Sequence, residues 1–270
     1  MKKNRYLIIA LISLSACFGD VEKYLSTDQQ VEGTEIIRIS QSLDESLIFA
    51  LQSFEYFKTV VPDTLPGCPD IEVNDAEKTV TLMFSNKSTC TNNTNMPRSG
   101  RILLQYINRS TFESSVVLIY DDYVVKGNAI EGLREFRRFT NLVNPNRRTE
   151  IFENLVIRND KQSSSKVSGT FVHQLTFQNS ALVQFTSEGN IEGRNIAGRK
   201  ITMSQGTVKT FEISCILSGH IMPKQGSENW QITHGTGQAF NHGLDFSSDG
   251  SCISSANIRL QDGRVMVVTQ

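Results

Sequence analysis

The feature that most constrains the fold is an alternation of apolar and polar residues that recurs from Cys68 onward. Its clearest instance is residues 167–177, where Val167, Phe171 and Leu175 share one parity. Successive side chains of a β-strand point to opposite faces, so a period of two indicates strands with one buried face. Similar strands are predicted near 79–85, 101–107, 116–120, 128–139, 151–158, 181–187, 199–203, 211–217, 229–233, 256–260 and 265–269.

The connections between these segments are short. Lys126-Gly127-Asn128 and Glu188-Gly189-Asn190 contain residues that tight hairpins need for positive φ. Parallel strands need long crossovers, and no helical pattern separates the strands. The predicted fold is therefore mainly β: an antiparallel meander that forms a curved sheet, a sandwich or an open barrel.

One amphipathic helix is expected before the strands. Ser42-Leu43-Asp44-Glu45 has the form of a capping box, and apolar residues follow at spacings of three and four up to Phe57. These observations predict a helix over about 43–58 that packs on the sheet and ends before Pro62. The polar stretch 17–40 is predicted to be a tether, and 41–270 a single β-rich domain.

Two short echoes suggest an internal duplication. Gly127-Asn128 and Gly189-Asn190 each precede an Ile-Glu, and four residues separate a Phe-Ser pair from Cys90 and another from Cys252. The two similar halves would divide near 161–166. Reuse of common hairpin turns is the alternative explanation.

Five cysteines would leave an odd thiol in an exported protein. If Cys17 is modified, Cys68, Cys90, Cys215 and Cys252 remain, and they allow three connectivities. The Phe-Ser…Cys echo favours Cys68 with Cys90 and Cys215 with Cys252. Four reduced cysteines or a zinc site are the alternatives, and the absence of any Cys-x-x-Cys pair argues against zinc.

The first 16 residues have the pattern of a secretory signal peptide. Lys2, Lys3 and Arg5 precede a nine-residue apolar stretch, which is too short to span a bilayer. Leu14-Ser15-Ala16-Cys17 resembles the lipobox of bacterial lipoproteins. That resemblance implies cleavage before Cys17 and lipidation of its thiol, with palmitate among the acyl groups.

The order of motifs from about residue 68 onward resembles a family of uncharacterised outer-membrane lipoproteins of Bacteroidota, with a lipobox, a short helix and a long β-meander. Where other members tend to have Asp-Asn-Tyr, this chain has Asp121-Asp122-Tyr123. The resemblance implies an address and a fold, and no activity. It is carried by Ser99-Gly100-Arg101-Ile102, Tyr120-Asp121-Asp122-Tyr123, Asn128-Ala129-Ile130-Glu131-Gly132, Cys215-Ile216-Leu217-Ser218-Gly219, Trp230-Gln231-Ile232 and Asp245-Phe246 before Gly250-Ser251-Cys252.

Charge argues against nucleic acid as a partner. The whole chain has 27 basic and 28 acidic side chains, and removal of residues 1–16 would take three basic ones and change the formal charge from −1 to −4. No basic run remains in the rest of the chain. The predicted address is the outer membrane, reached through the lipid anchor, because Phe18 rather than an Asp stands immediately after Cys17. Whether the protein faces the periplasm or the cell surface stays open, as does any protein or glycan partner.

Residues capable of catalysis or metal binding are few and scattered. His220, His234 and His242 suggest a metal site, but their Gly-rich spacing is more typical of ordinary hairpin or surface histidines. His173 is predicted to be a core histidine bonded to a neighbour. Asp121 and Asp122 are expected in a turn, since adjacent strand residues point to opposite faces. No catalytic residue, metal or cofactor is predicted.

These observations predict a lipid-anchored cell-envelope protein with a non-enzymatic binding or structural role. The first alternative is a carrier that holds a lipid or another apolar ligand in the curled sheet. An enzyme acting on envelope polysaccharide or peptide is the third hypothesis.

Overall fold

In the computed structural model, thirteen antiparallel strands form one sheet in which each strand pairs with its neighbours in the chain. The structure describes residues 18–85, 90, 96–140, 144–235 and 237–269, and for 18–27 the backbone alone. The sheet is curved and does not close, because β1 and β13 remain its two edges. The predicted antiparallel meander is confirmed. The strands are β1 (Asp70–Asn74), β2 (Thr79–Ser85), β3 (Arg98–Asn108), β4 (Glu113–Val125), β5 (Asn128–Phe139), β6 (Arg147–Arg158), β7 (Ser164–Gln178), β8 (Ala181–Arg194), β9 (Lys200–Glu212), β10 (Gln225–Thr233), β11 (Ala239–Ser248), β12 (Ser254–Arg259) and β13 (Val265–Thr269).

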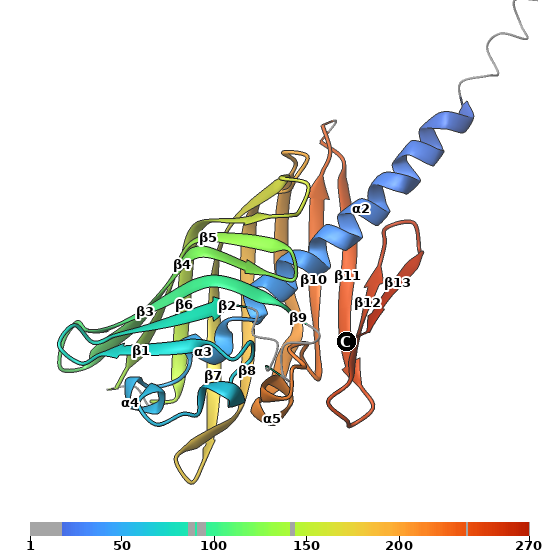
Figure 1. Cartoon of the computed structure of the whole chain (residues 1–270). Coiled ribbons are helices and arrows are strands. Elements are labelled where there is room, and N and C mark those ends of the chain that lie inside the picture. The colour runs from blue at the N-terminus through green and yellow to red at the C-terminus, as the bar shows by residue number, and fades with distance from the viewer. Residues whose placement is uncertain (1–17, 86–89, 91–95, 141–143, 236, 270) are drawn as a thin grey trace, which may run out of the picture.

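A long helix, α2 (Phe18–Asp44), runs into the curl of the sheet, and its first turns project past the strands (Figure 1). Inside the curl the helix is enclosed on nearly all sides, and Ile36, Ile39 and Leu43 are buried against the concave face. The sheet therefore wraps around a central helix, which supplies part of the core.

The helix lies earlier in the chain than predicted. The stretch 17–40, expected to be a tether, is helical from residue 18, and the stretch 43–58 is broken into α3 (Leu47–Ala50) and α4 (Phe54–Phe57). The first break falls where Glu45 and Ser46 bond to side chains of the sheet. The second falls at Ser53, whose hydroxyl accepts a hydrogen bond from the backbone N–H of Tyr56 and caps α4.

Bulges bend the long strands around the helix. The pairing shifts between Ser99 and Arg101 of β3 and between Tyr120 and Tyr123 of β4, and further shifts follow in the strands up to β10. Gly100 has φ +81°, and a Cβ there would lie 2.0 Å from the carbonyl oxygen of Asp122. Only glycine permits the two strands to approach so closely at this bend.

Several predicted turns lie inside strands. Asp121 and Asp122 belong to β4, where Asp122 takes φ +50° at the bulge, and Glu188-Gly189-Asn190 belongs to the middle of β8. Lys126-Gly127 does form the β4–β5 hairpin, so the two Gly-Asn echoes occupy different places in the fold. Residues 161–166 span the β6–β7 hairpin, through which the sheet continues unbroken.

The segment 211–217 is a strand only at its start. β9 ends at Glu212, and α5 (Ile213–Leu217) follows, with Ile213, Cys215 and Ile216 buried. Cys215 is bonded to Cys252 in the β11–β12 loop, and this closed loop of 37 residues holds the short helix against the sheet end. Cys68 is bonded to Cys90, so the predicted pairing is confirmed.

Among the described residues, no helix is both long and apolar enough to cross a membrane.

Candidate functional site

The side of α2 that meets the sheet carries acidic residues, although it is buried. Glu32 and Glu35 are 1 % exposed, and so is Glu45 just after the helix, while Asp44 is 6 % exposed. An unpaired buried carboxylate costs several kcal/mol, so each requires a partner on the concave face of the sheet. We call the resulting set the interior polar network. Its members are Glu32, Glu35, Asp44, Glu45, Arg98, Arg134, Glu150, His173, Arg199, Lys209, Glu228, His234 and His242.

Arg134 lies at the centre of this network. Its Nε donates to Glu150 at 2.6 Å, and its Nη1 donates to the carbonyl oxygen of Leu43 at 2.7 Å. His173 Nε2 lies 2.8 Å from the other carboxylate oxygen of Glu150. Burial would raise the pKa of Glu150, but Arg134 and His173 outweigh it and lower the pKa to about 2. Burial lowers the pKa of His173, so the ring is neutral at pH 7 and its Nε2–H donates to the carboxylate. His173 is the bonded core histidine that its strand position predicts.

Lys209 lies between two carboxylates. Its Nζ is 2.7 Å from Asp44 and 2.8 Å from Glu228, and Ser40 and Trp230 donate to Glu228 as well. Burial raises the pKa of Asp44 to about 6 despite the nearby lysine. One lysine thus joins the end of α2 to β9 and β10.

Glu45 accepts hydrogen bonds from two neighbouring strands. Tyr123 donates at 2.9 Å and Arg98 Nε at 3.3 Å, and both partners are fully enclosed. Ser46 bonds the hydroxyl of Tyr120 at 2.7 Å. These contacts fix the chain as it leaves α2 and turns toward α3.

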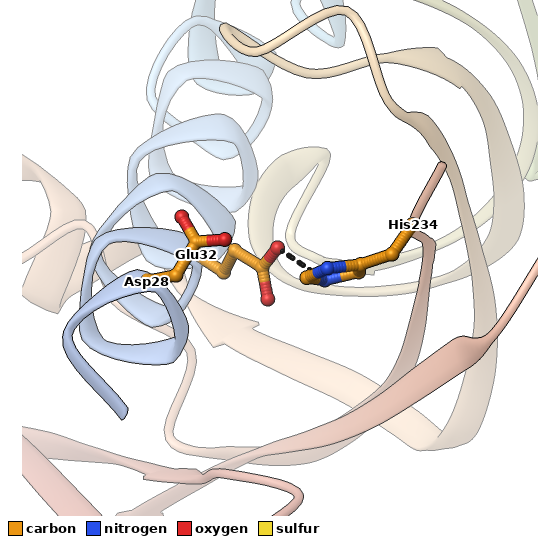
Figure 2. A group of neighbouring side chains, drawn as sticks. All are labelled: Asp28, Glu32 and His234. Atoms are coloured by element: carbon orange, nitrogen blue, oxygen red, sulfur yellow. Dashed lines mark ion pairs between the residues drawn. The ribbon is translucent and has the colours of Figure 1, made fainter. Parts of the chain in front are cut away.

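Glu32 forms a cluster with two histidines and an arginine at the end of the curl where α2 enters. Figure 2 shows Asp28 and Glu32 on α2 and His234 reaching toward Glu32 from the loop after β10. His234 Nε2 lies 2.9 Å from Glu32, and His242 Nε2 lies 3.2 Å from it. Burial would raise the pKa of Glu32, but His242, His234 and Arg199 together lower it.

Asp28, Glu32 and His234 present ligand atoms within 4.8 Å of one another, as a metal site would. Arg199 however lies on the same carboxylates, in ion pairs with Asp28 and with Glu32 at 2.7 Å. A divalent cation would meet the guanidinium charge at that point, so the group fits an ion-pair cluster better than a metal site. The cluster holds α2 against the ends of β8, β10 and β11.

The opposite end of the curl holds a cavity of about 990 Å³. It opens where the β3–β4, β5–β6 and β7–β8 connections meet the segment from α3 to α4 and helix α5. Buried Phe136, Leu182 and Ile213 form part of its wall. Tyr106 donates to the carbonyl oxygen of Gln52 at 3.2 Å and so holds the α3–α4 connection over β3. The α3–α4 connection, which bounds the cavity, is thus held in place by its own hydrogen bond to the sheet.

The wall of this cavity contains two arginines, Arg138 of β5 and Arg148 of β6, among mostly apolar and hydroxyl side chains. None of the described residues lining it is a histidine, a cysteine or an aspartate, and Glu55 is its one carboxylate. The described lining thus combines apolar side chains with a few polar and charged ones, as ligand-binding pockets do.

The residues singled out by sequence lie apart from the cavity, with one exception. Cys17 and the signal peptide of residues 1–16 lie outside the described residues. Cys68 and Cys90 lie at the other end of the sheet, whereas the Cys215–Cys252 bridge holds α5, which lines the cavity. His234 and His242 do meet, but His242 is buried rather than on the surface.

Sequence reasoning missed the interior polar network and the cavity arginines. The acids of α2 resemble a solvated helix face, and nothing local marks them as buried. A signal did exist in the strands: Arg134 and Arg138 share a parity with Phe136, on the apolar face of β5. Charged residues on the buried parity of a strand require partners, and that pattern could have indicated an interior site. No known protein family, curated protein or solved structure matches this chain.

Proposed function

We propose that this protein is a non-enzymatic, lipid-anchored binding protein of the cell envelope that holds an apolar ligand in the cavity at the open end of its curled sheet. The observation that carries the proposal is the cavity itself. Its volume of about 990 Å³ lies at the upper end of the ~300–1,000 Å³ typical of small-molecule sites. Apolar and aromatic side chains form about half of its described lining, beside hydroxyl and amide groups.

The course of α2 supports the anchor. Cys17 immediately precedes the first residue of the helix, which continues into the centre of the fold (Figure 1). Ten helical residues from Phe18 span about 15 Å at ~1.5 Å per residue. A lipid on Cys17 would thus be joined to the body through a helix, which would hold the cavity at a fixed spacing from the bilayer. The resemblance to outer-membrane lipoproteins of Bacteroidota supports the same address.

A binding role is favoured over catalysis by where the ionisable groups lie. Most acids and bases of the interior polar network are enclosed and paired with one another, as Glu150 is with Arg134 and His173. The cavity, which a substrate would enter, offers Glu55 as its only carboxylate among the described lining residues.

The ligand is tested by native mass spectrometry of the purified full chain, with extraction of whatever copurifies. We expect an added mass that extracts into organic solvent and that Leu182→Asp removes, because this change places a charge in the apolar wall. Leu133→Asp is the matched control, since Leu133 is 49 % exposed. A bare chain under gentle ionisation, with no uptake of added acyl lipids, contradicts the proposal.

The anchor is tested separately by growth with labelled fatty acid. Cys17→Ala should abolish incorporation into the protein, and continued labelling would refute lipidation at this residue. Protease treatment of intact cells then distinguishes the two faces of the outer membrane, because only a surface-exposed body is degraded.

A further inference from the structure

The cavity contains two arginines that form no ion pair with any residue that the structure describes. Phe136 pairs with Glu150 and Arg137 with Thr149 across β5 and β6, so Arg138 and Arg148 face each other on the next rung. Both line the cavity. Two neighbouring strands thus place two positive charges side by side on one wall.

Neither arginine has an ion-pair partner among the described residues. Arg148 Nη1 donates to the carbonyl oxygens of Pro145 and Arg147, at 2.9 and 3.0 Å. The Nε of Arg138 is buried without an acceptor. The part of the β5–β6 loop outside the described residues, 141–143, is Asn-Leu-Val, so its sequence offers no carboxylate side chain.

The buried cations of the concave face behave differently from these two half-buried arginines. Arg98, Arg134 and Lys209 each contact a carboxylate within 3.3 Å. Burial, together with the charge of Arg138, lowers the pKa of Arg148 to about 10. An anion that enters the cavity would stabilise the charged form of Arg148, because it offsets both the cost of burying that charge and its repulsion from Arg138.

The remaining wall determines what kind of anion fits. Val116, Phe177 and Leu217, none of them fully buried, present apolar surface to the same cavity, and Glu55 is engaged by Lys58 at 3.4 Å. A small inorganic anion would leave this apolar surface uncovered. A neutral apolar molecule would leave the arginines unpaired in a partly desolvated site.

We propose that the cavity binds an amphiphile with a carboxylate or phosphate head group, which Arg138 and Arg148 hold while its apolar body lies against Val116, Phe177 and Leu217. This assignment rests on the proposed binding function and adds the chemical class of the ligand. Guanidinium groups suit both head groups, because each can donate two parallel hydrogen bonds to a pair of oxygens.

The experiment compares four probes by calorimetric titration of the full chain: oleate, oleoyl lysophosphatidate, oleyl alcohol and inorganic phosphate. We expect at least one of the two anionic amphiphiles to bind about 10- to 100-fold more tightly than oleyl alcohol, the usual effect of charged hydrogen bonds. The stronger of the two identifies the head group. Inorganic phosphate should bind far more weakly than either.

Variants assign that preference to the two arginines. Arg138→Gln and Arg148→Gln should each reduce binding of the preferred anion about tenfold or more and leave binding of oleyl alcohol unchanged. Arg147→Gln is the matched control, because Arg147 is exposed, adjacent in sequence and outside the cavity lining. Arg138→Gln breaks no side-chain hydrogen bond to the backbone in the described part of the chain, so it remains informative if Arg148→Gln destabilises the chain.

The outcomes separate this inference from the proposed function. If oleate, lysophosphatidate and oleyl alcohol bind equally, the arginines do not hold an anionic head group. The proposal of an apolar binding protein would then remain. If inorganic phosphate binds as tightly as lysophosphatidate, the apolar body does not contribute to binding, and the ligand is not an amphiphile. Failure of all four probes to bind overturns both proposals.

Discussion

Arg134 contributes to stability through several contacts at once. It contacts Glu150, Ser46, Tyr120 and the end of α2, and it is 1 % exposed. Arg134→Met leaves the carboxylate of Glu150 without its arginine, and we expect a loss of about 3–5 kcal/mol in the free energy of unfolding. Urea denaturation monitored by circular dichroism measures it.

The matched control for Arg134 is Arg137→Met on the same strand. Arg137 pairs with Glu135 at 2.8 Å, but its side chain is 37 % exposed. Exposed ion pairs contribute about 0–1 kcal/mol, so this variant should remain close to the wild type. Equal losses in the two variants would show that burial of the network does not determine its contribution.

Asp44 should make stability depend on pH. Its pKa rises from 3.8 to about 6 on folding, mainly by burial, so the folded state binds the proton more tightly than the unfolded state does. This contribution is complete below pH 4 and is lost as the pH rises through 6. Asp44→Asn cannot titrate, so its stability relative to the wild type should increase by up to about 3 kcal/mol between pH 4 and pH 7.

Denaturation of wild type and Asp44→Asn at several pH values measures this difference. Glu150 should act in the opposite direction, because its pKa is lowered to about 2 and its contribution is lost only in acid below its ordinary range. A wild-type-to-variant difference that stays constant from pH 4 to pH 7 would contradict the assigned shift of Asp44.

At the scale of elements, the two disulfides close loops of similar size at different places. The separations are 22 and 37 residues, which correspond to about 3–4 kcal/mol each on the chain-entropy model. Of the two bridges, the second holds an element of the described cavity wall, because Cys215 lies in α5, whose Ile213 and Leu217 line the cavity. Removal of either bridge should therefore lower stability by a similar amount, whereas only removal of the second should weaken ligand binding.

The test uses paired serine variants at both cysteines of each bridge. Cys68→Ser with Cys90→Ser should lower the thermal midpoint and preserve the affinity for the preferred acyl probe. Cys215→Ser with Cys252→Ser should lower the thermal midpoint by a similar amount and should also weaken binding of the probe. The same affinity in both variants, measured below their midpoints, would show that α5 does not shape the cavity.

Elements also show which parts of the fold the sequence could predict. The alternation that predicted residues 167–177 is present in β7, where Val167, Phe171 and Leu175 are buried. The same alternation misled at 211–217, because five residues of α5 can bury alternate apolar side chains without being a strand. Over so short a segment, the spacing of apolar residues cannot distinguish a short helix from a strand.

Long-range partners explain the remaining errors. Glu45 was interpreted as a capping residue, but it bonds Tyr123 and Arg98, which lie 78 and 53 residues away. The cavity likewise depends on register, since Arg138 and Arg148 meet only when β5 and β6 are paired. The disulfides were predictable because a repeated local frame marked them.

The whole molecule is a single sheet wound around one helix, and neither part has a complete core alone. Without α2 and the residue that follows it, the concave face would expose Lys209 without Asp44 and Arg98 without Glu45, together with the apolar surface under Ile36 and Ile39. A curved sheet with two free edges would then have little to hold its curl. Folding should thus be cooperative between the helix and all thirteen strands.

Two shortened chains test this cooperativity. A chain that begins at residue 28 loses the turns that project past the strands in Figure 1 and should keep the thermal midpoint within a few degrees. A chain that begins at residue 47 loses Glu32, Asp44 and Glu45, and we expect it not to fold. The chain's one tryptophan, Trp230, reports the result, because it is 1 % exposed and donates to Glu228 inside the curl. A blue-shifted, cooperatively melting tryptophan signal from the shorter chain would show that the sheet holds its curl without the helix.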